Sequence, residues 1–128
     1  MSYYVATTLN QPFEAAVAAT REALAQEGFG VITEIDVQKT MQAKLGLAFR
    51  PYLILGACNP ALAHAALMLE DKVGTMLPCN VVVQDVGGGR TEVAAIDPVA
   101  SMAAIDNPAL KTAAAEVGAK LRAAIGRL

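Results

Sequence analysis

Hydrophobic and polar positions recur along this chain with two different periods, and the changes of period mark the predicted elements. Apolar residues alternate with polar ones over residues 29–36, whereas they recur every third or fourth position over residues 13–24 and 110–128. A period of two is typical of a strand and a period near 3.6 of a helix. Together with runs rich in Val, Ile, Tyr and Thr, the pattern predicts strands over residues 2–8, 29–36, 52–57, 79–86 and 91–96.

Helices are predicted between these strands, and short polar side chains mark where they begin. An oxygen-bearing side chain followed by proline is a helix start, because the oxygen caps free N–H groups and proline suits the first turn. Three such pairs occur: Asn59-Pro60, Asp97-Pro98 and Asn107-Pro108. Asn10 and Asp36 are further predicted caps, and Gly28 and Gly46 are predicted helix ends. In the helix over residues 60–69 we expect Leu62, Ala65, Ala66 and Leu69 to be buried.

The order of the elements predicts the fold class. A strand–helix–strand unit occurs twice, and Gly87-Gly88-Gly89 predicts a hairpin between the last two strands. Such units favour parallel strands, whereas a hairpin joins antiparallel ones. We therefore expect an α+β two-layer sandwich: a mixed sheet of about five strands built from βαβ-type units, with helices mainly on one face. A chain of 128 residues fits one domain spanning residues 1–128.

Composition narrows the functional classes. The chain is 55% hydrophobic and 17% charged, with a net charge of −2. Few aromatic and basic residues argue against a nucleic-acid surface. No apolar run is long enough to span a bilayer, and the N-terminus lacks the charged start of a signal peptide, so we expect a soluble cytoplasmic protein without membrane partners. The low charge and high apolar content also favour a homodimer.

Residues 50–83 hold most of the candidate chemistry. They contain both cysteines, Cys58 and Cys79, and the single histidine, His64. Cys58 directly precedes the helix start at Asn59, where the partial positive charge of a helix N-terminus lowers a thiol pKa and favours the reactive thiolate. The alternative is a small buried residue at the end of a central strand. Cys58, Asn59, His64 and Cys79 are the candidate ligand-binding residues, and Cys58 is the candidate nucleophile.

The predicted strand directions bear on whether the two cysteines act together. If the strands at residues 52–57 and 79–86 run parallel, Cys58 and Cys79 lie at opposite ends of the sheet, roughly 20 Å apart. We then expect neither a disulfide nor a shared metal. Metal-ligand spacing such as Cys-x-x-Cys is absent, and no base or paired carboxylates accompany Cys58, so we predict no metal or cofactor and recognise no catalytic constellation.

Several segments together resemble the family called domain of unknown function 302. They are Glu27-Gly28-Phe29-Gly30-Val31, Glu34-Ile35-Asp36-Val37, the run from Pro51 to Pro60, Leu77-Pro78-Cys79-Asn80-Val81-Val82-Val83 and Ala95-Ile96-Asp97-Pro98. The resemblance covers nearly the whole chain. It implies a small bacterial or archaeal α+β domain that is dimeric, and it implies no activity.

Three functional hypotheses follow. The first is a domain that binds a small molecule or an anion near the helix start at Asn59, where backbone N–H groups point outward. The second is a thiol-dependent or sulfur-handling protein that uses Cys58. The third is a non-catalytic subunit-interaction domain whose apolar surface is its function. The first is preferred.

Overall fold

Five strands form a single sheet in the order β1-β5-β4-β3-β2. The computed structural model describes residues 2–128. Every neighbouring pair of strands is antiparallel. The strands are β1 Tyr4–Leu9, β2 Gly30–Asp36, β3 Tyr52–Cys58, β4 Cys79–Gly87 and β5 Arg90–Ile96.

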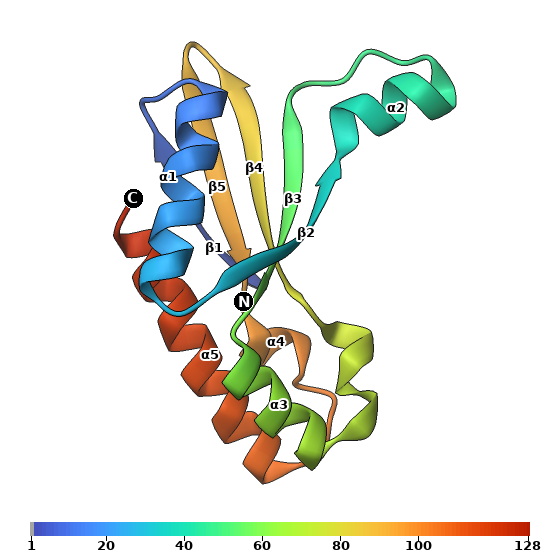
Figure 1. Cartoon of the computed structure of the whole chain (residues 1–128), viewed down its shortest axis with the longest axis vertical. Coiled ribbons are helices and arrows are strands. Elements are labelled where there is room, and N and C mark those ends of the chain that lie inside the picture. Colours follow the sequence, from blue (N-terminus) through green and yellow to red (C-terminus); the bar gives the residue numbers. More distant parts are fainter. Residues whose placement is uncertain (1) are drawn as a thin grey trace.

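The α+β class and the five predicted strands are confirmed, but the expectation of a mixed sheet is wrong. β3 and β4 are adjacent and antiparallel, so they do not form a βαβ unit. β1 and β2 lie at opposite edges of the sheet, so the helix between them joins no neighbouring pair. The reason is visible in Figure 1: the helical segment after β3 stays below the end of the sheet and does not return along its face.

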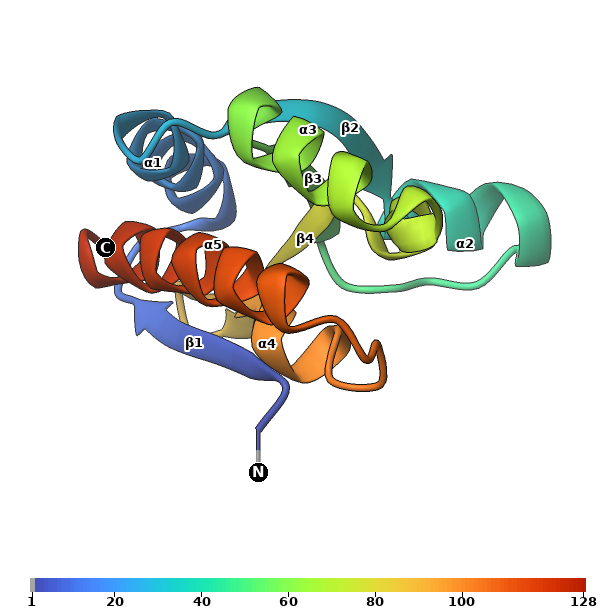
Figure 2. The same cartoon turned by 90° about the horizontal axis from the view of Figure 1, so that it is seen from below.

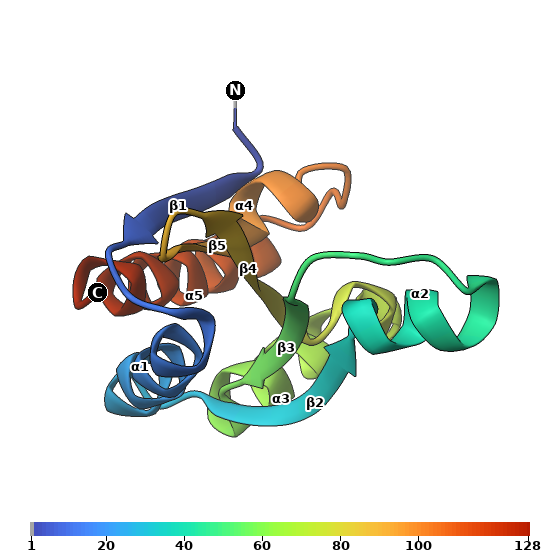
Figure 3. The same ribbon diagram turned by 90° about the horizontal axis from the view of Figure 1, so that it is seen from above.

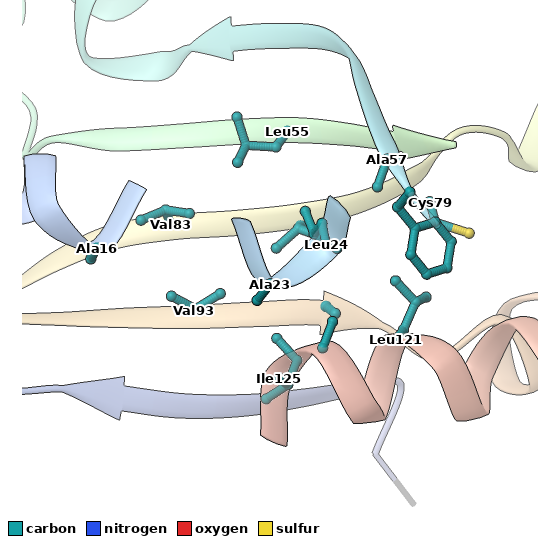
Figure 4. Close-up of a cluster of buried hydrophobic side chains, with 14 of the residues drawn as sticks. Ala16, Ala23, Leu24, Leu55, Ala57, Cys79, Val83, Val93, Leu121 and Ile125 are labelled. Atoms are coloured by element: carbon teal, nitrogen blue, oxygen red, sulfur yellow. The ribbon is translucent and has the colours of Figure 1, made fainter. Parts of the chain in front are cut away.

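Two helices cover one face of the sheet, α1 (Phe13–Gln26) and α5 (Pro108–Gly126). Seen from above, the sheet curves around them, and they occupy its concave side (Figure 3). The buried face of α1 is Ala16, Thr20, Ala23 and Leu24, as the sequence period predicts. These side chains pack against alternate residues of the central strands, including Leu55, Val83 and Val93, to form the main hydrophobic core (Figure 4).

The predicted helix starts are confirmed with one exception. The side chains of Asp36, Asn59, Asp97 and Asn107 each accept a hydrogen bond from a backbone N–H in the first turn of the helix that follows. Asn10 does not cap α1, because that helix begins at Phe13 with Pro12 at its N-cap and no side-chain cap. Gly28 and Gly46 do end helices in the left-handed conformation, with φ of 85° and 64°.

A second layer lies beyond the end of the sheet. It contains α3 (Pro60–Leu69), the 3-10 helix η1 (Asp71–Met76) and the short α4 (Pro98–Ser101). Seen from below in Figure 2, α3 and α4 lie on either side of the N-terminal half of α5, and both contact it. These elements bury a second cluster of five residues, Ala66, Val73, Met102, Leu110 and Ala114. α5 therefore joins two separate hydrophobic clusters.

The remaining helix, α2 (Val37–Leu45), projects away from the sheet (Figure 1) and has no buried residue. Its apolar positions, including Leu45 at its C-terminal end, do not enter either cluster. Of the helices in residues 2–128, none is both long enough and apolar enough to cross a membrane.

Candidate functional site

A cavity of about 350 Å³ lies between the end of the sheet and the helical layer beneath it. Small-molecule sites in proteins span roughly 300–1,000 Å³, so this volume suits a small ligand. The walls come from the ends of β3 and β4, from α3 and η1, and from α4 and α5. The lining residues are Phe29, Ile32, Ala57, Cys58, Asn59, Leu62, Ala63, Ala66, Leu67, Gly74, Leu77, Pro78, Cys79, Pro98, Met102, Leu110, Ala113, Ala114 and Val117.

Small side chains on two facing helices create this space. Ala63 and Ala66 of α3 line the cavity opposite Ala113 and Ala114 of α5. Alanine methyl groups are too short to fill the space between the two helices, so they leave a volume that larger side chains would occupy. The cavity also separates the two hydrophobic clusters, since Ala57 and Cys79 belong to one and Ala66 and Leu110 to the other. It is thus a gap between two cores.

The position of the cavity depends on a close approach at Gly56. A Cβ atom at this residue would overlap Thr33 Oγ1 and would lie 2.7 Å from Pro78 Cγ. Glycine is therefore required, because only a residue without Cβ lets these side chains pack directly on the strand. Pro78 immediately precedes Cys79, so this contact fixes where β4 begins.

The two cysteines lie at the same end of the sheet. In the antiparallel register of β3 and β4, Cys79 is directly opposite Ala57, the neighbour of Cys58. The expectation that they lie at opposite ends is wrong, because it rested on parallel strands. Both are free thiols, and both line the cavity. The two cysteines are therefore not separated by the length of the sheet, but Cys79 lies on the same face as Ala57 and Cys58 on the opposite face.

The Cys79 thiol is held in its neutral form. Burial, and to a lesser extent the charge of a Cys58 thiolate, raise the pKa of Cys79 from 9.0 to about 11. Cys79 is only 7% exposed, so burial is the expected main cause. Figure 4 shows its sulfur pointing away from the side chains of the main core. At neutral pH this end of the cavity therefore carries an uncharged thiol.

Asn59 is the one lining residue with a polar amide or charged side chain in the described residues, and its amide oxygen is already used. Its Oδ1 accepts a hydrogen bond of 3.2 Å from the Leu62 N–H. The Ala63 N–H donates to the Asn59 carbonyl at 2.9 Å, and Pro60 has no N–H. The start of α3 thus has few donors left for an anion. The geometry favours an uncharged ligand over the anion that the sequence left open.

The other predicted residues differ in their placement. Cys58, Asn59 and Cys79 come together in the cavity, but His64 is exposed and does not line it. The face of α3 also differs in part from the one expected, because Ala65 is exposed and Leu69 is 41% exposed. The face of α3 that lines the cavity consists of Leu62, Ala63, Ala66 and Leu67.

Sequence reasoning missed the opposite wall of the cavity. Met102 follows α4, and Leu110, Ala114 and Val117 are spaced by three or four along α5. The sequence shows this period as one amphipathic stripe, which does not distinguish positions that face a core from positions that face a cavity. Side-chain size does not separate the two ends either, because small residues are as frequent in the C-terminal half of α5 as in its N-terminal half.

The chain is similar to one protein family and to a solved structure of that family. Residues 5–128 match the profile of the family described as "Domain of unknown function DUF302". A crystal structure of an uncharacterized conserved protein DUF302 from Bacillus stearothermophilus is 32% identical and superposes with a TM-score of 0.91. The match covers 99% of this chain and 98% of that one. No curated protein matches the chain.

Proposed function

Because this chain belongs to the DUF302 family, whose description assigns no activity, we propose a function from the cavity itself: the protein binds a small, uncharged, apolar molecule between α3 and α5. The observation that carries this proposal is the lining. Alkyl, aromatic and sulfur-bearing side chains make up almost all of it, and no charged side chain in the described residues contributes. Pockets lined mainly by hydrophobic side chains are typical binding sites for small molecules.

Thermal unfolding with matched pairs of ligands tests the proposal. We expect indole and benzyl alcohol to raise the melting temperature in a saturable way, and indole-3-carboxylate and benzoate to have little effect, because burying a carboxylate without a partner is unfavourable. A ligand at ten times its dissociation constant stabilises a protein by about 1.4 kcal/mol. Equal or stronger stabilisation by the two carboxylates would contradict the proposal, as would no saturable effect from either neutral compound.

Two alanines on one helix provide the matched variants. Ala66→Leu places a larger side chain in the cavity, whereas Ala65→Leu places the same side chain on the exposed face of α3. We expect the first to abolish the effect of indole and the second to preserve it. If both variants respond like the parent protein, indole binds elsewhere and the cavity is not its site.

We also propose that the open face of the sheet associates with a second copy of the chain. Directly paired residues form an apolar row across all five strands on this face, Ala6, Ala94, Val82, Ile54 and Ile35. A polar chain flanks the row, since Arg50 Nε donates to Gln84 Oε1 at 2.9 Å and Gln84 Nε2 donates to Glu92 Oε1 at 3.1 Å. With a cation at one end and an anion at the other, this flank is self-complementary under a two-fold rotation.

Light scattering at micromolar concentration tests this second proposal. We expect a dimer for the parent chain and a monomer for Val82→Lys, which places a charge in the middle of the row. Val99→Lys is the matched control, because Val99 is 44% exposed on α4 and lies outside the sheet. A monomeric parent protein, or a dimer that survives Val82→Lys, would refute the open face as the interface.

A further inference from the structure

The two edges of the sheet differ in how they are protected. An exposed edge strand offers unpaired backbone groups to other chains, and proteins blunt such edges with charges, prolines or bulges. β2, at one edge, has a bulge between Val31 and Thr33 and two carboxylates, those of Glu34 and Asp36. β1, at the other edge, has the sequence Tyr-Val-Ala-Thr-Thr-Leu and a regular register, so it has none of these features.

The pairing of β1 with β5 identifies the backbone groups on the outer side of β1. The Tyr3 carbonyl accepts a hydrogen bond of 2.8 Å from the first residue after β5, so alternate residues from Tyr3 onward bond to β5. The backbone groups of Tyr4, Ala6 and Thr8 therefore point outward. Ser2 Oγ accepts from the Tyr4 N–H at 3.3 Å and donates to the Tyr4 carbonyl at 2.8 Å. Beyond Ala6 and Thr8 lies no element of the described chain (Figures 2 and 3).

The β2 edge leads into an element that lacks packing. Residues 37–49, which we call the arm, comprise α2 and most of the segment that returns to β3. α2 has nine residues and none is buried, although a helix this short owes most of its stability to tertiary packing. Leu45 and Leu47, at and just after its C-terminal end, are 63% and 56% exposed. α2 lies on the open side of the sheet, across from α1 and α5 (Figures 2 and 3).

The open-face dimer proposed above, on which this step rests, brings the arm to the β1 edge of the partner. β4 is the middle strand, so a two-fold axis parallel to it sets β3 opposite the partner's β5 and β2 opposite the partner's β1. This axis also sets Arg50, near the start of β3, opposite Glu92 of the partner subunit, which is a favourable match of charge. The open faces are convex, so they meet at the middle strands and diverge toward the edges, where α2 projects (Figure 3).

We propose that the arm of each chain packs along the β1 edge of the other chain. Residues 47–49 belong to no helix or strand, so their backbone can bond to the outward groups of Ala6 and Thr8 in the manner of an added strand. Leu45 and Leu47 pack against the side chains of the same strand. The contact gives the arm the packing that it lacks within its own chain, and it closes the β1 edge to further strands.

Photo-crosslinking tests this contact in the intact dimer. Leu45 is replaced by p-benzoylphenylalanine, which reacts on irradiation with C–H bonds that touch it. We expect a covalent dimer, and mass spectrometry should locate the crosslink within residues 4–9 of the partner. Val99, which is 44% exposed on α4, is the matched control position and should give no covalent dimer. The proposal is overturned if position 45 gives no covalent dimer, or crosslinks only to other segments.

A charged arm tests the contribution of the contact to assembly. The double variant Leu45→Asp, Leu47→Asp should raise the dissociation constant of the dimer at least tenfold, as measured by light scattering over a dilution series. Met68→Asp is the control, because Met68 is 75% exposed on α3, and it should dimerise like the parent chain. If the double variant keeps the parent's dissociation constant while Val82→Lys is monomeric, the arm contact is absent and the open-face dimer stands. A monomeric parent chain would overturn both proposals.

Discussion

The contact at Gly56 allows a sharp test of how the sheet end is built. In Gly56→Ala, the new Cβ overlaps Thr33 Oγ1 and lies 2.7 Å from Pro78 Cγ. The Thr33 hydroxyl must leave its native position to make room, and the Pro78 ring cannot turn away. Overpacking of this kind typically destabilises a protein by about 1–3 kcal/mol. Because the ring cannot yield, we expect a value near the upper end of that range.

The unfolded state offsets part of this effect. Replacing glycine by alanine reduces the entropy of the unfolded chain and stabilises a protein by about 0.4–1 kcal/mol where the native backbone accepts the side chain. The net loss for Gly56→Ala should therefore be about 2 kcal/mol. For a chain of this size, that corresponds to a fall in melting temperature of roughly 6–10 °C.

Gly30→Ala is the matched control for this experiment. Gly30 also lies in a strand at the same end of the sheet, opposite Cys58, but a Cβ there meets nothing within 4 Å. We expect Gly30→Ala to be neutral or slightly stabilising. Thr33→Ala should recover part of the loss in the double variant with Gly56→Ala, through a coupling of at least about 0.5 kcal/mol.

Urea denaturation of five proteins decides the outcome: the parent chain, Gly56→Ala, Gly30→Ala, Thr33→Ala and the double variant. The steric explanation requires Gly56→Ala to be clearly less stable than Gly30→Ala. It also requires Thr33→Ala to restore part of the lost stability in the double variant. If the free energies of unfolding of Gly56→Ala and Gly30→Ala differ by less than about 0.5 kcal/mol, the close approach does not exist in solution. The placement of Pro78 and Cys79 would then have to be revised.

Three further predictions concern the two hydrophobic layers. Ala66→Leu adds three buried carbons at about 0.8 kcal/mol each, less rotamer entropy, so it should raise the free energy of unfolding by about 1.5 kcal/mol, whereas Ala65→Leu should not. Because folding raises the pKa of Cys79 from 9.0 to about 11, the neutral thiol contributes fully to the free energy of unfolding below pH 9, and this contribution is lost as pH rises through 11. Between these pH values the free energy of unfolding of the parent chain should fall by roughly 2–3 kcal/mol more than that of Cys79→Ala, as measured by denaturation at each pH. Asn107→Ala removes bonds to the Leu110 N–H and the Leu69 carbonyl, and should lower the melting temperature more than Asn107→Asp, which retains the cap.

The elements of this fold were predictable because their signals are local. The cap and proline at Asn107-Pro108 act within one helical turn, and the observed α5 begins at Pro108. The hydrophobic stripe of α1 needs only its own period, and the structure buries it as expected. Asn10 was the exception, because a suitable side chain caps a helix only if the backbone starts the helix there. The structure starts α1 later, at Phe13.

The candidate site was predicted only in part, because its composition depends on contacts between distant elements. Cys58, Asn59 and Cys79 stood out as residue types, and they do lie together. The apolar wall from α4 and α5 carries no such signal, since alanines at helical spacing look the same whether they face a core or a cavity. The face of α3 was misassigned for the same reason. Its amphipathic pattern is weak, and its partner is α5 and not the sheet.

Strand direction was the decisive unknown, and the structure shows what determines it. The 20 residues between Cys58 and Cys79 are long enough for a crossover to a parallel strand, which needs a dozen or more. A crossover, however, would require α3 to pack on a face of the sheet, whereas in the structure α3 makes its main contacts with α5 and η1. Ala66 of α3 is buried instead in the cluster below the sheet that includes Leu110 and Ala114 of α5, and after η1 the chain returns as β4 beside β3. The antiparallel direction of β4 thus places Cys58 and Cys79 at the same end of the sheet, beside one cavity.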